Sequence, residues 1–188
     1  MIKLTIVTVT KNDCKNFQKT LLSIKKIKSD SIQYIVVDGN SIDKTLSVLA
    51  HNRDIIDDYM SEKDSGIYDA MNKGLDVASG RYVMFLNSGD ELKDINRILS
   101  DIERIDLKKS PTLLYGSEFS WSASLTKVIV PKFIFCKMPT SHQAMIFNTH
   151  QAKLYYYNTK YEFSADYELY LRIKKNTMDE SLVFNQVV

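Results

Sequence analysis

The sequence has few cysteines, little net charge and no long apolar run, and each shortage excludes a class of protein. Its two cysteines, Cys14 and Cys136, are too few for a disulfide framework and lack the partners that a zinc cluster needs. No apolar stretch approaches the roughly 20 residues of a membrane span, and the run at 4–9 is too short for a signal-peptide core. A net charge of +2 gives no reason to expect nucleic acid as a partner. We therefore expect a soluble, cytoplasmic protein.

The chain does have enough apolar residues for a core, since 44% of its 188 residues are hydrophobic, and its length suggests one domain. In the first half, short β-branched runs alternate with segments whose apolar residues recur at helical spacing. We expect strands at 4–9, 34–37, 55–60 and 82–86, and helices at 17–27, 41–50, 66–77 and 95–105, the second of them capped by Ser41. This alternation predicts an α/β fold with a mostly parallel central sheet flanked by helices.

The second half is less regular. Its apolar runs predict strands at 112–115, 127–130, 144–147 and 181–187, and its last clear helix is at 165–174. We expect this half to pack against the carboxyl edge of the parallel sheet, where open α/β sheets bind their ligands. The polar residues that follow each strand are therefore the candidates for a site.

Each strand end carries a polar cluster that has both a structural and a ligand-binding interpretation. The segments 8–12 and 38–45 can be turns that cap helices, or can present a hydroxyl and the Asp38 carboxylate to a nucleotide. Asp69 and Lys73 can form a simple i,i+4 ion pair, while Asp64, Tyr68 and Asn72 beside them can bind a nucleotide. The segment 87–91 can be a polar turn, or can deliver a carboxylate to Mg²⁺ or Mn²⁺.

The order of these clusters along the chain resembles glycosyltransferase family two, which has the GT-A fold (the nucleotide-diphospho-sugar transferase, Rossmann-like fold). The similarity covers essentially the whole chain and is strongest to the branch that builds bacterial exopolysaccharide, including colanic-acid-type transferases. The segments that carry it are 8–12, 38–45, 64–74, 80–82, 86–90, 142–143 and 165–169.

The resemblance implies a hexosyltransferase-type, metal-dependent, inverting enzyme of bacterial cell-surface polysaccharide biosynthesis. Its donor would be a nucleotide-diphosphate sugar, with UDP as the expected nucleotide, and its acceptor a hydroxyl of a saccharide or lipid-linked molecule. It implies that Asp166 is the catalytic base, that Asp90 binds Mn²⁺ or Mg²⁺ and that His142 and Gln143 lie on the acceptor side. The residues implied for the nucleotide sugar are Thr8, Thr10, Asp38, Asp64, Asp69, Lys73, Asn87 and Ser88.

Two departures from the family pattern limit these expectations. Asn87 and Gly89 stand where most relatives have acids, so Asp90 is the charged ligand that remains, with Glu91 beside it. Relatives also continue beyond the last strand, so we expect the acceptor half, 92–188, to be truncated relative to them, whereas 1–91 would form the nucleotide-sugar half of the same domain. Asp166 has an alternative role as a helix N-terminal acid that the dipole favours.

Three further alternatives remain open from the residues alone. The basic first helix can be a solvated face or can rest on an anionic inner membrane surface. The depleted metal motif leaves a catalytically silent nucleotide-sugar-binding or scaffold subunit as an alternative to the enzyme. A nucleotidyltransferase is a third reading, although the segment 8–14 lacks the glycines of a phosphate loop. The sequence does not encode the sugar, the linkage or the oligomeric state.

Overall fold

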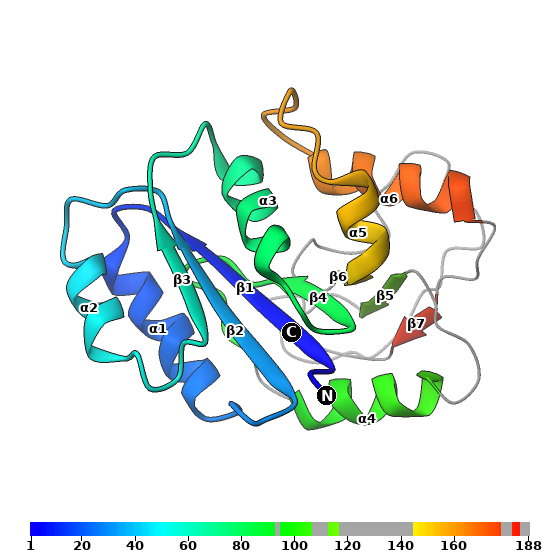
Figure 1. The fold of residues 1–188 in the computed structure, drawn as a ribbon, viewed down its shortest axis with the longest axis horizontal. Coiled ribbons are helices and arrows are strands. Elements are labelled where there is room, and N and C mark those ends of the chain that lie inside the picture. Colours follow the sequence, from blue (N-terminus) through cyan, green and yellow to red (C-terminus); the bar gives the residue numbers. More distant parts are fainter. Residues whose placement is uncertain (93–94, 107–112, 117–144, 178–181, 185–188) are drawn as a thin grey trace, which may run out of the picture.

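The structure, a computed structural model, describes residues 1–92, 95–106, 113–116, 145–177 and 182–184. In this part of the chain the strands form one seven-stranded sheet with the order β3-β2-β1-β4-β6-β5-β7, and helices lie on both of its faces (Figure 1). The strands are β1 (Leu4–Thr10), β2 (Ile32–Asp38), β3 (Asp58–Ser61), β4 (Tyr82–Phe85), β5 (Leu113–Gly116), β6 (Met145–Asn148) and β7 (Leu182–Phe184). The helices are α1 (Cys14–Lys25), α2 (Thr45–His51), α3 (Ile67–Val77), α4 (Ile95–Asp106), α5 (Thr149–Tyr155) and α6 (Ala165–Thr177).

The parallel part of the sheet brings the predicted strand ends together. β3, β2, β1 and β4 are parallel neighbours, and the register pairs Thr10 with Asp38 and Asp38 with Ser61. The chain that leaves β4 continues beside β1, where the amide of Ser88 donates to the carbonyl of Val9 over 3.3 Å. The carboxyl ends of these strands therefore form one edge, as a mostly parallel sheet requires. β6 pairs antiparallel with both β4 and β5.

Two hydrophobic layers hold the helices on the sheet. One layer joins the sheet to α1, α2 and α4, and the other joins it to α3, α5 and α6. Ile6 belongs to the first layer and its neighbour Val7 to the second, because successive strand side chains point to opposite faces. Every residue of β1 is buried, which is the expected pattern for a central parallel strand covered on both sides.

Helix α3 packs directly against β1 and β2 at a glycine. A Cβ atom on Gly74 would stand 2.4 Å from Cγ1 of Val7 and 3.2 Å from Cγ2 of Val37, so only glycine fits between the helix and the two strands. The predicted apolar face of this helix, which includes Met71 and Leu75, is buried in the second layer. This packing fixes the start of α3 beside the carboxyl edge of the sheet.

Most predicted elements are confirmed, but some details are wrong. Ser41 does not cap α2, because the helix begins at Thr45 and the carboxylate of Asp43 accepts the Thr45 amide instead, over 2.9 Å. The predicted strand at 55–60 begins later, at Asp58, and its first apolar residues are core residues of a loop. Helix α5 was not predicted. The predicted strand at 127–130 lies outside the described residues.

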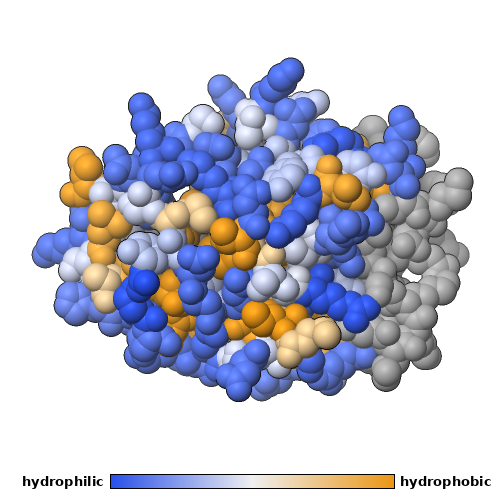
Figure 2. Space-filling view, viewed as in Figure 1, coloured by the Kyte–Doolittle hydropathy of each residue, from blue (hydrophilic) through white to orange (hydrophobic). Residues whose placement is uncertain are grey.

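The face of the molecule that carries α3 and α6 is mainly hydrophilic, with hydrophobic residues in separate patches (Figure 2). Across the described ranges, no helix has the length and apolar character needed to cross a membrane. The most exposed large apolar side chains include Phe163, in the loop before α6, and Ile42, in the loop after β2.

Candidate functional site

The carboxylate of Asp38 is the centre of a buried hydrogen-bond network at the end of β2. It is fully buried and accepts from the amide of Ser41 over 2.9 Å and from the hydroxyl of Ser61 over 2.7 Å. It also accepts from the Ser41 hydroxyl. The carboxylate thus accepts three hydrogen bonds from the protein, and these bonds hold the loops after β2 and β3 in place.

The loops after β1 and β2 are locked together by a reciprocal pair of hydrogen bonds. The amide of Asn12 donates to Oγ of Ser41 over 2.7 Å, and the amide of Ile42 donates to Oδ1 of Asn12 over 2.8 Å. The Asp43 carboxylate accepts the amide of Cys14 over 3.0 Å. Hydrogen bonding from Thr45 lowers the pKa of Asp43. The two motifs that sequence analysis singled out therefore build one rigid rim.

Thr8 and Thr10 lie on the same strand but in different surroundings. Thr8 is fully buried, and its hydroxyl accepts from the Tyr34 hydroxyl over 3.2 Å in the core, where burial raises the pKa of Tyr34. Thr10 is the last residue of β1, and its buried hydroxyl has no hydrogen-bond partner among the described residues. A donor contact of Thr8 stays a prediction that this packing does not favour, and the contact of Thr10 stays a prediction as well, with its hydroxyl buried at the edge of the sheet.

Asp64 lies over the backbone of Gly39. A Cβ atom on Gly39 would stand 2.2 Å from Oδ2 of Asp64, so the glycine leaves the space that this carboxylate occupies. Asp64 forms an ion pair with Lys11 at 3.6 Å and accepts the amide of Gly66 over 3.2 Å. A carboxylate and a lysine thus lie together over Gly39, where the loops after β1, β2 and β3 meet.

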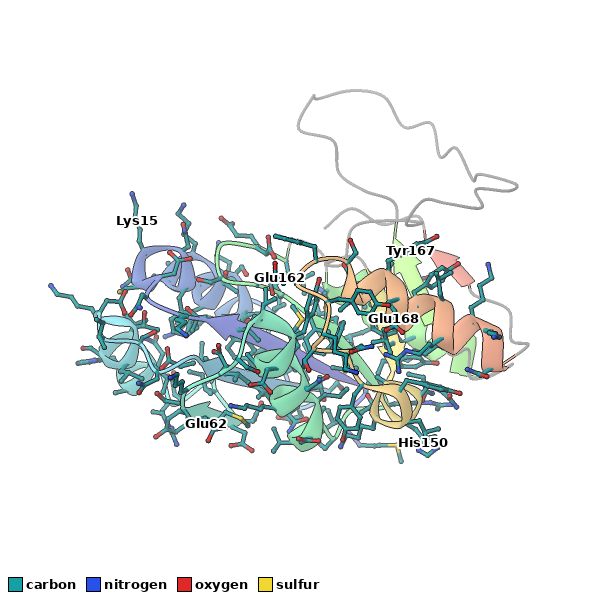
Figure 3. The ribbon with its side chains drawn as sticks, turned by 90° about the horizontal axis from the view of Figure 1, so that it is seen from above. Lys15, Glu62, His150, Glu162, Tyr167 and Glu168 are labelled. Atoms are coloured by element: carbon teal, nitrogen blue, oxygen red, sulfur yellow. The ribbon has the colours of Figure 1, made fainter. Side chains whose placement is uncertain are left out.

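Asp69 and Lys73 form the ion pair that the structural interpretation predicted, with 3.7 Å between Nζ and Oδ2. Lys73 also contacts Glu62 at 2.7 Å, which raises the pKa of Lys73, and donates to the carbonyl of Lys63 over 2.9 Å. The amide of Ser65 donates to Asp69 and lowers its pKa. Both residues are therefore engaged in holding the loop from β3 to α3, where Figure 3 labels Glu62.

The segment after β4 forms a tight turn that is fixed from helix α1. The amide of Asn87 donates to the carboxylate of Asp90 over 3.0 Å, and Gly89 takes a left-handed backbone conformation with φ of 99°. The hydroxyl of Thr20 accepts the Gly89 amide over 2.9 Å and donates to the carbonyl of Asp90 over 2.7 Å. This turn also contains Ser88, and it lies beside the end of β1.

The acids of this turn fit a divalent cation only as part of a larger ligand set. Within the ranges that the structure describes, no group of three or more histidine, cysteine or acidic side chains could hold a metal ion. Asp90 supplies one carboxylate, and protein-bound Mg²⁺ often has one or two carboxylates with substrate phosphates and water completing its shell. The residues therefore suit a metal that is bound jointly by the protein and a phosphate-bearing ligand.

Asp166 lies in the first turn of α6, beside a cluster of aromatic side chains at the end of β4. Its charge, after burial, is a cause of the raised pKa values of Tyr68 and Tyr157. Tyr68 stacks on Tyr157 with 5.4 Å between ring centroids, and Tyr157 meets the ring of Phe85, the last residue of β4, edge-on at 5.2 Å. Asp166 itself is buried, with 7% of its surface exposed. These contacts place Asp166 at the same edge of the sheet as the other acids.

The structure thus gathers Thr10, Asp38, Asp64 and the turn with Asp90 at the edge of the sheet, with Asp166 joined to it through the aromatic cluster. Asp69 and Lys73 are engaged with the loop between β3 and α3, and Thr8 lies in the core. His142 and Gln143 lie outside the described residues. From the sequence, Tyr157 is one of a group of tyrosines that can stack on a sugar, with core packing the favoured role for most of the group; the structure packs its ring on Tyr68 and Phe85, contacts with residues more than 70 positions away that sequence reasoning did not name.

A comparison with protein families gives one match over more than half of the chain. The family described as "Glycosyl transferase family 2" matches residues 5–107. An uncharacterized glycosyltransferase of Mycobacterium tuberculosis is 30% identical over 175 residues, which cover 89% of this chain and 67% of the relative.

Solved structures share the fold at low sequence identity. TarS residues 1–349 of Staphylococcus aureus, in complex with UDP, has a TM-score of 0.76 and 18% identity, covering 100% of this chain and 61% of that one. A mannosyltransferase of Pyrobaculum calidifontis, in complex with GDP-Man and Mn²⁺, has a TM-score of 0.71 and 13% identity, covering 98% and 55%. The likeness shows that this chain has the GT-A fold, and that it spans about three fifths of these structures.

Proposed function

Because the chain belongs to glycosyl transferase family 2, we propose that it transfers a sugar from a UDP-sugar to a hydroxyl group of a saccharide or lipid-linked acceptor, with inversion at the anomeric carbon. The setting we propose is bacterial cell-surface polysaccharide biosynthesis. The fold supports a single domain in which 1–91 binds the nucleotide sugar and 92–188 carries the base and the acceptor side. A UDP complex of a fold neighbour supports the choice of nucleotide.

One observation carries the proposal: a buried carboxylate at the start of α6 stands at the same sheet edge as the polar ends of β1, β2 and β4. Asp166 is linked to β4 through Tyr157 and Phe85, and the turn with Asp90 leaves the same strand. Parallel α/β sheets bind ligands at this edge. Charged groups that are far apart in sequence therefore converge where a donor and an acceptor would meet.

The donor would lie along the rim formed by the loops after β1, β2 and β3. Thr10 has a buried hydroxyl that finds no partner in the part of the chain that the structure describes, and a hydrogen bond to the nucleoside would satisfy it. Asp64 and Lys11 offer an acceptor and a donor above Gly39, whose missing side chain leaves the space that the Asp64 carboxylate occupies. Asp38 would support the donor site indirectly, because its carboxylate holds Ser41 and Ser61 in the loops of the rim.

The chemical step is a displacement at the anomeric carbon. The acceptor oxygen forms a bond to this carbon while the bond from the carbon to the diphosphate oxygen breaks, and the acceptor proton passes to the carboxylate of Asp166. The nucleoside diphosphate leaves with the electron pair of the broken bond. A base on the face opposite the leaving group raises the rate typically by a factor of about 10² to 10⁴.

Negative charge develops on the departing diphosphate, and the turn after β4 is the part of the chain suited to meet it. Asp90 would hold Mn²⁺ or Mg²⁺ together with the donor, and the bound ion supplies neutralising charge to the leaving group. The Mn²⁺ complex of the mannosyltransferase supports this assignment. The side chains of Asn87 and Ser88 lie in the same turn and would be its donors to phosphate oxygens, since the amide of Asn87 already donates to Asp90 and that of Ser88 to Val9.

Product release from a panel of UDP-sugars tests the proposal, with Mn²⁺ in one series and EDTA in the other. We expect UDP release that EDTA lowers at least tenfold, and faster release when a saccharide acceptor is added. UDP binding without any release would support a silent subunit, and pyrophosphate release from a nucleoside triphosphate would support a nucleotidyltransferase. Either of these results would contradict the proposal.

A further inference from the structure

Helix α3 is tied to the chain segment that delivers Asp166 by two side chains one turn apart. Asn72 donates from Nδ2 to the carbonyl of Tyr157 over 2.8 Å and accepts the Tyr157 amide at Oδ1 over 2.8 Å. One side-chain amide thus satisfies both backbone groups of a residue 85 positions away. The loop 156–164 leads from this point to α6, so its starting point is fixed on α3.

Tyr68 fixes the other end of the same loop. Its ring stacks on Tyr157, and its hydroxyl faces the backbone amides of Ser164, Ala165 and Asp166 at the start of α6. Because Tyr68 and Asn72 are four residues apart on α3, they share one face of the helix and act on the loop together. α3 is in turn pressed against β1 and β2 at Gly74, so the link has a rigid base.

From these contacts we infer that Tyr68 and Asn72 are positioning residues for Asp166 and do not bind the nucleotide. The inference rests on the proposed function, in which Asp166 is the base. It departs from the interpretation in which Asp64, Tyr68 and Asn72 all bind the nucleotide. Asp64 lies at the rim beside Lys11, while Tyr68 and Asn72 contact Tyr157 in the segment that leads to α6.

A base must stand within hydrogen-bond reach of the proton it takes, and a misplacement of about 1 Å can lower the rate about a hundredfold. Tyr68→Phe keeps the stacked ring but removes the hydroxyl at the start of α6. Asn72→Ala removes both bonds to Tyr157 and frees the loop. Each change should therefore act on turnover and leave the rim over Gly39 intact.

Tyr156→Phe is a matched control. The Tyr156 hydroxyl donates to Asp76 of α3 over 2.6 Å, so this variant also removes a phenol hydroxyl between α3 and the same loop, on the exposed side away from Asp166. The readouts are the melting temperature, the dissociation constant for UDP, and kcat for UDP release from UDP-GlcNAc with water as acceptor. Each substitution is also combined with Asp166→Asn.

We expect Tyr68→Phe and Asn72→Ala to lower kcat at least tenfold with the UDP dissociation constant changed less than twofold, while Tyr156→Phe leaves both unchanged. In the Asp166→Asn background, Tyr68→Phe should lower the remaining release less than twofold, because its partner is already lost. A weakened UDP affinity at constant kcat, or equal losses of kcat in both backgrounds, would overturn the inference.

Failure of the proposed function would look different. If Asp166→Asn alone turns over like the wild type, the base assignment is wrong and the positioning inference falls with it. If Asp166→Asn is inactive but Tyr68→Phe and Asn72→Ala keep wild-type kcat, only the positioning inference is wrong.

Discussion

Replacing Asp38 should reveal how much of the rim depends on one buried carboxylate. The carboxylate accepts three hydrogen bonds, two at Oδ2 from Ser41 and Ser61 and one at Oδ1 from Ser41. In Asp38→Asn, the amide oxygen can keep the two bonds at the Oδ2 position, while the amide nitrogen meets the Ser41 hydroxyl. One bond to a charged group is then lost, which corresponds to about 1.5–3 kcal/mol of the free energy of unfolding.

Asp38→Ala removes all three acceptors and leaves buried donors unpaired, so we expect a loss of about 3–6 kcal/mol. Urea denaturation monitored by circular dichroism measures both values. Asp54→Asn is the control, because Asp54 is exposed and its ion pair with Lys25 is long, at 3.9 Å; it should change stability by no more than about 0.5 kcal/mol. A loss in Asp38→Asn no larger than in this control would refute the reasoning.

Three further predictions follow from the packing and the charges. Gly74→Ala should destabilise the protein by about 1–3 kcal/mol in urea denaturation, because its Cβ meets Val7 at 2.4 Å, and Val7→Ala should partly rescue it; additive losses would contradict this packing. Gly39→Ala should displace the Asp64 carboxylate and weaken UDP binding about tenfold by calorimetry with little change in melting temperature, whereas unchanged affinity would remove Asp64 from the donor rim. Because the pKa of Asp69 is lowered in the folded state, its contribution to stability is present above its ordinary pKa and is lost as the pH falls through the lower folded value. The stability difference between wild type and Asp69→Asn should therefore be full at pH 7 and disappear once the pH is below the lowered pKa of Asp69, and a difference independent of pH would contradict the assignment.

Local patterns were sufficient to predict the sheet and the helices on it. Period and composition located β1, β2, β4 and α3 because these elements bury their apolar residues in the regular way that sequence shows. Ser41 was misassigned because it has the right residue type for a cap, but the buried Asp38 competes for it. α5 was missed because it is short, and its two buried residues, Thr149 and Ala152, are too few to show a helical period in the sequence.

The location of the candidate site was predictable from the sequence, but the role of each residue in it was less so. Thr10, Asp38 and the turn with Asp90 each follow a parallel strand, so they lie at one edge of the sheet. The alternation of strands and helices along the sequence is enough to predict this. The direction in which each side chain of α3 points was not predictable, because it depends on which loop the helix contacts. From its position in the sequence, Asn72 is a candidate to form hydrogen bonds with a nucleotide. In the structure, however, its side-chain nitrogen and oxygen are both bonded to the backbone of Tyr157.

The comparison of wild type with Asp166→Asn tests the central claim most directly, with UDP release and UDP-sugar affinity measured on the same samples. The account predicts that release falls by a factor of about 10² or more, as loss of a general base implies, while the affinity for the UDP-sugar stays within twofold of the wild type. Release at the wild-type rate, or lost release explained by lost donor binding, would contradict it.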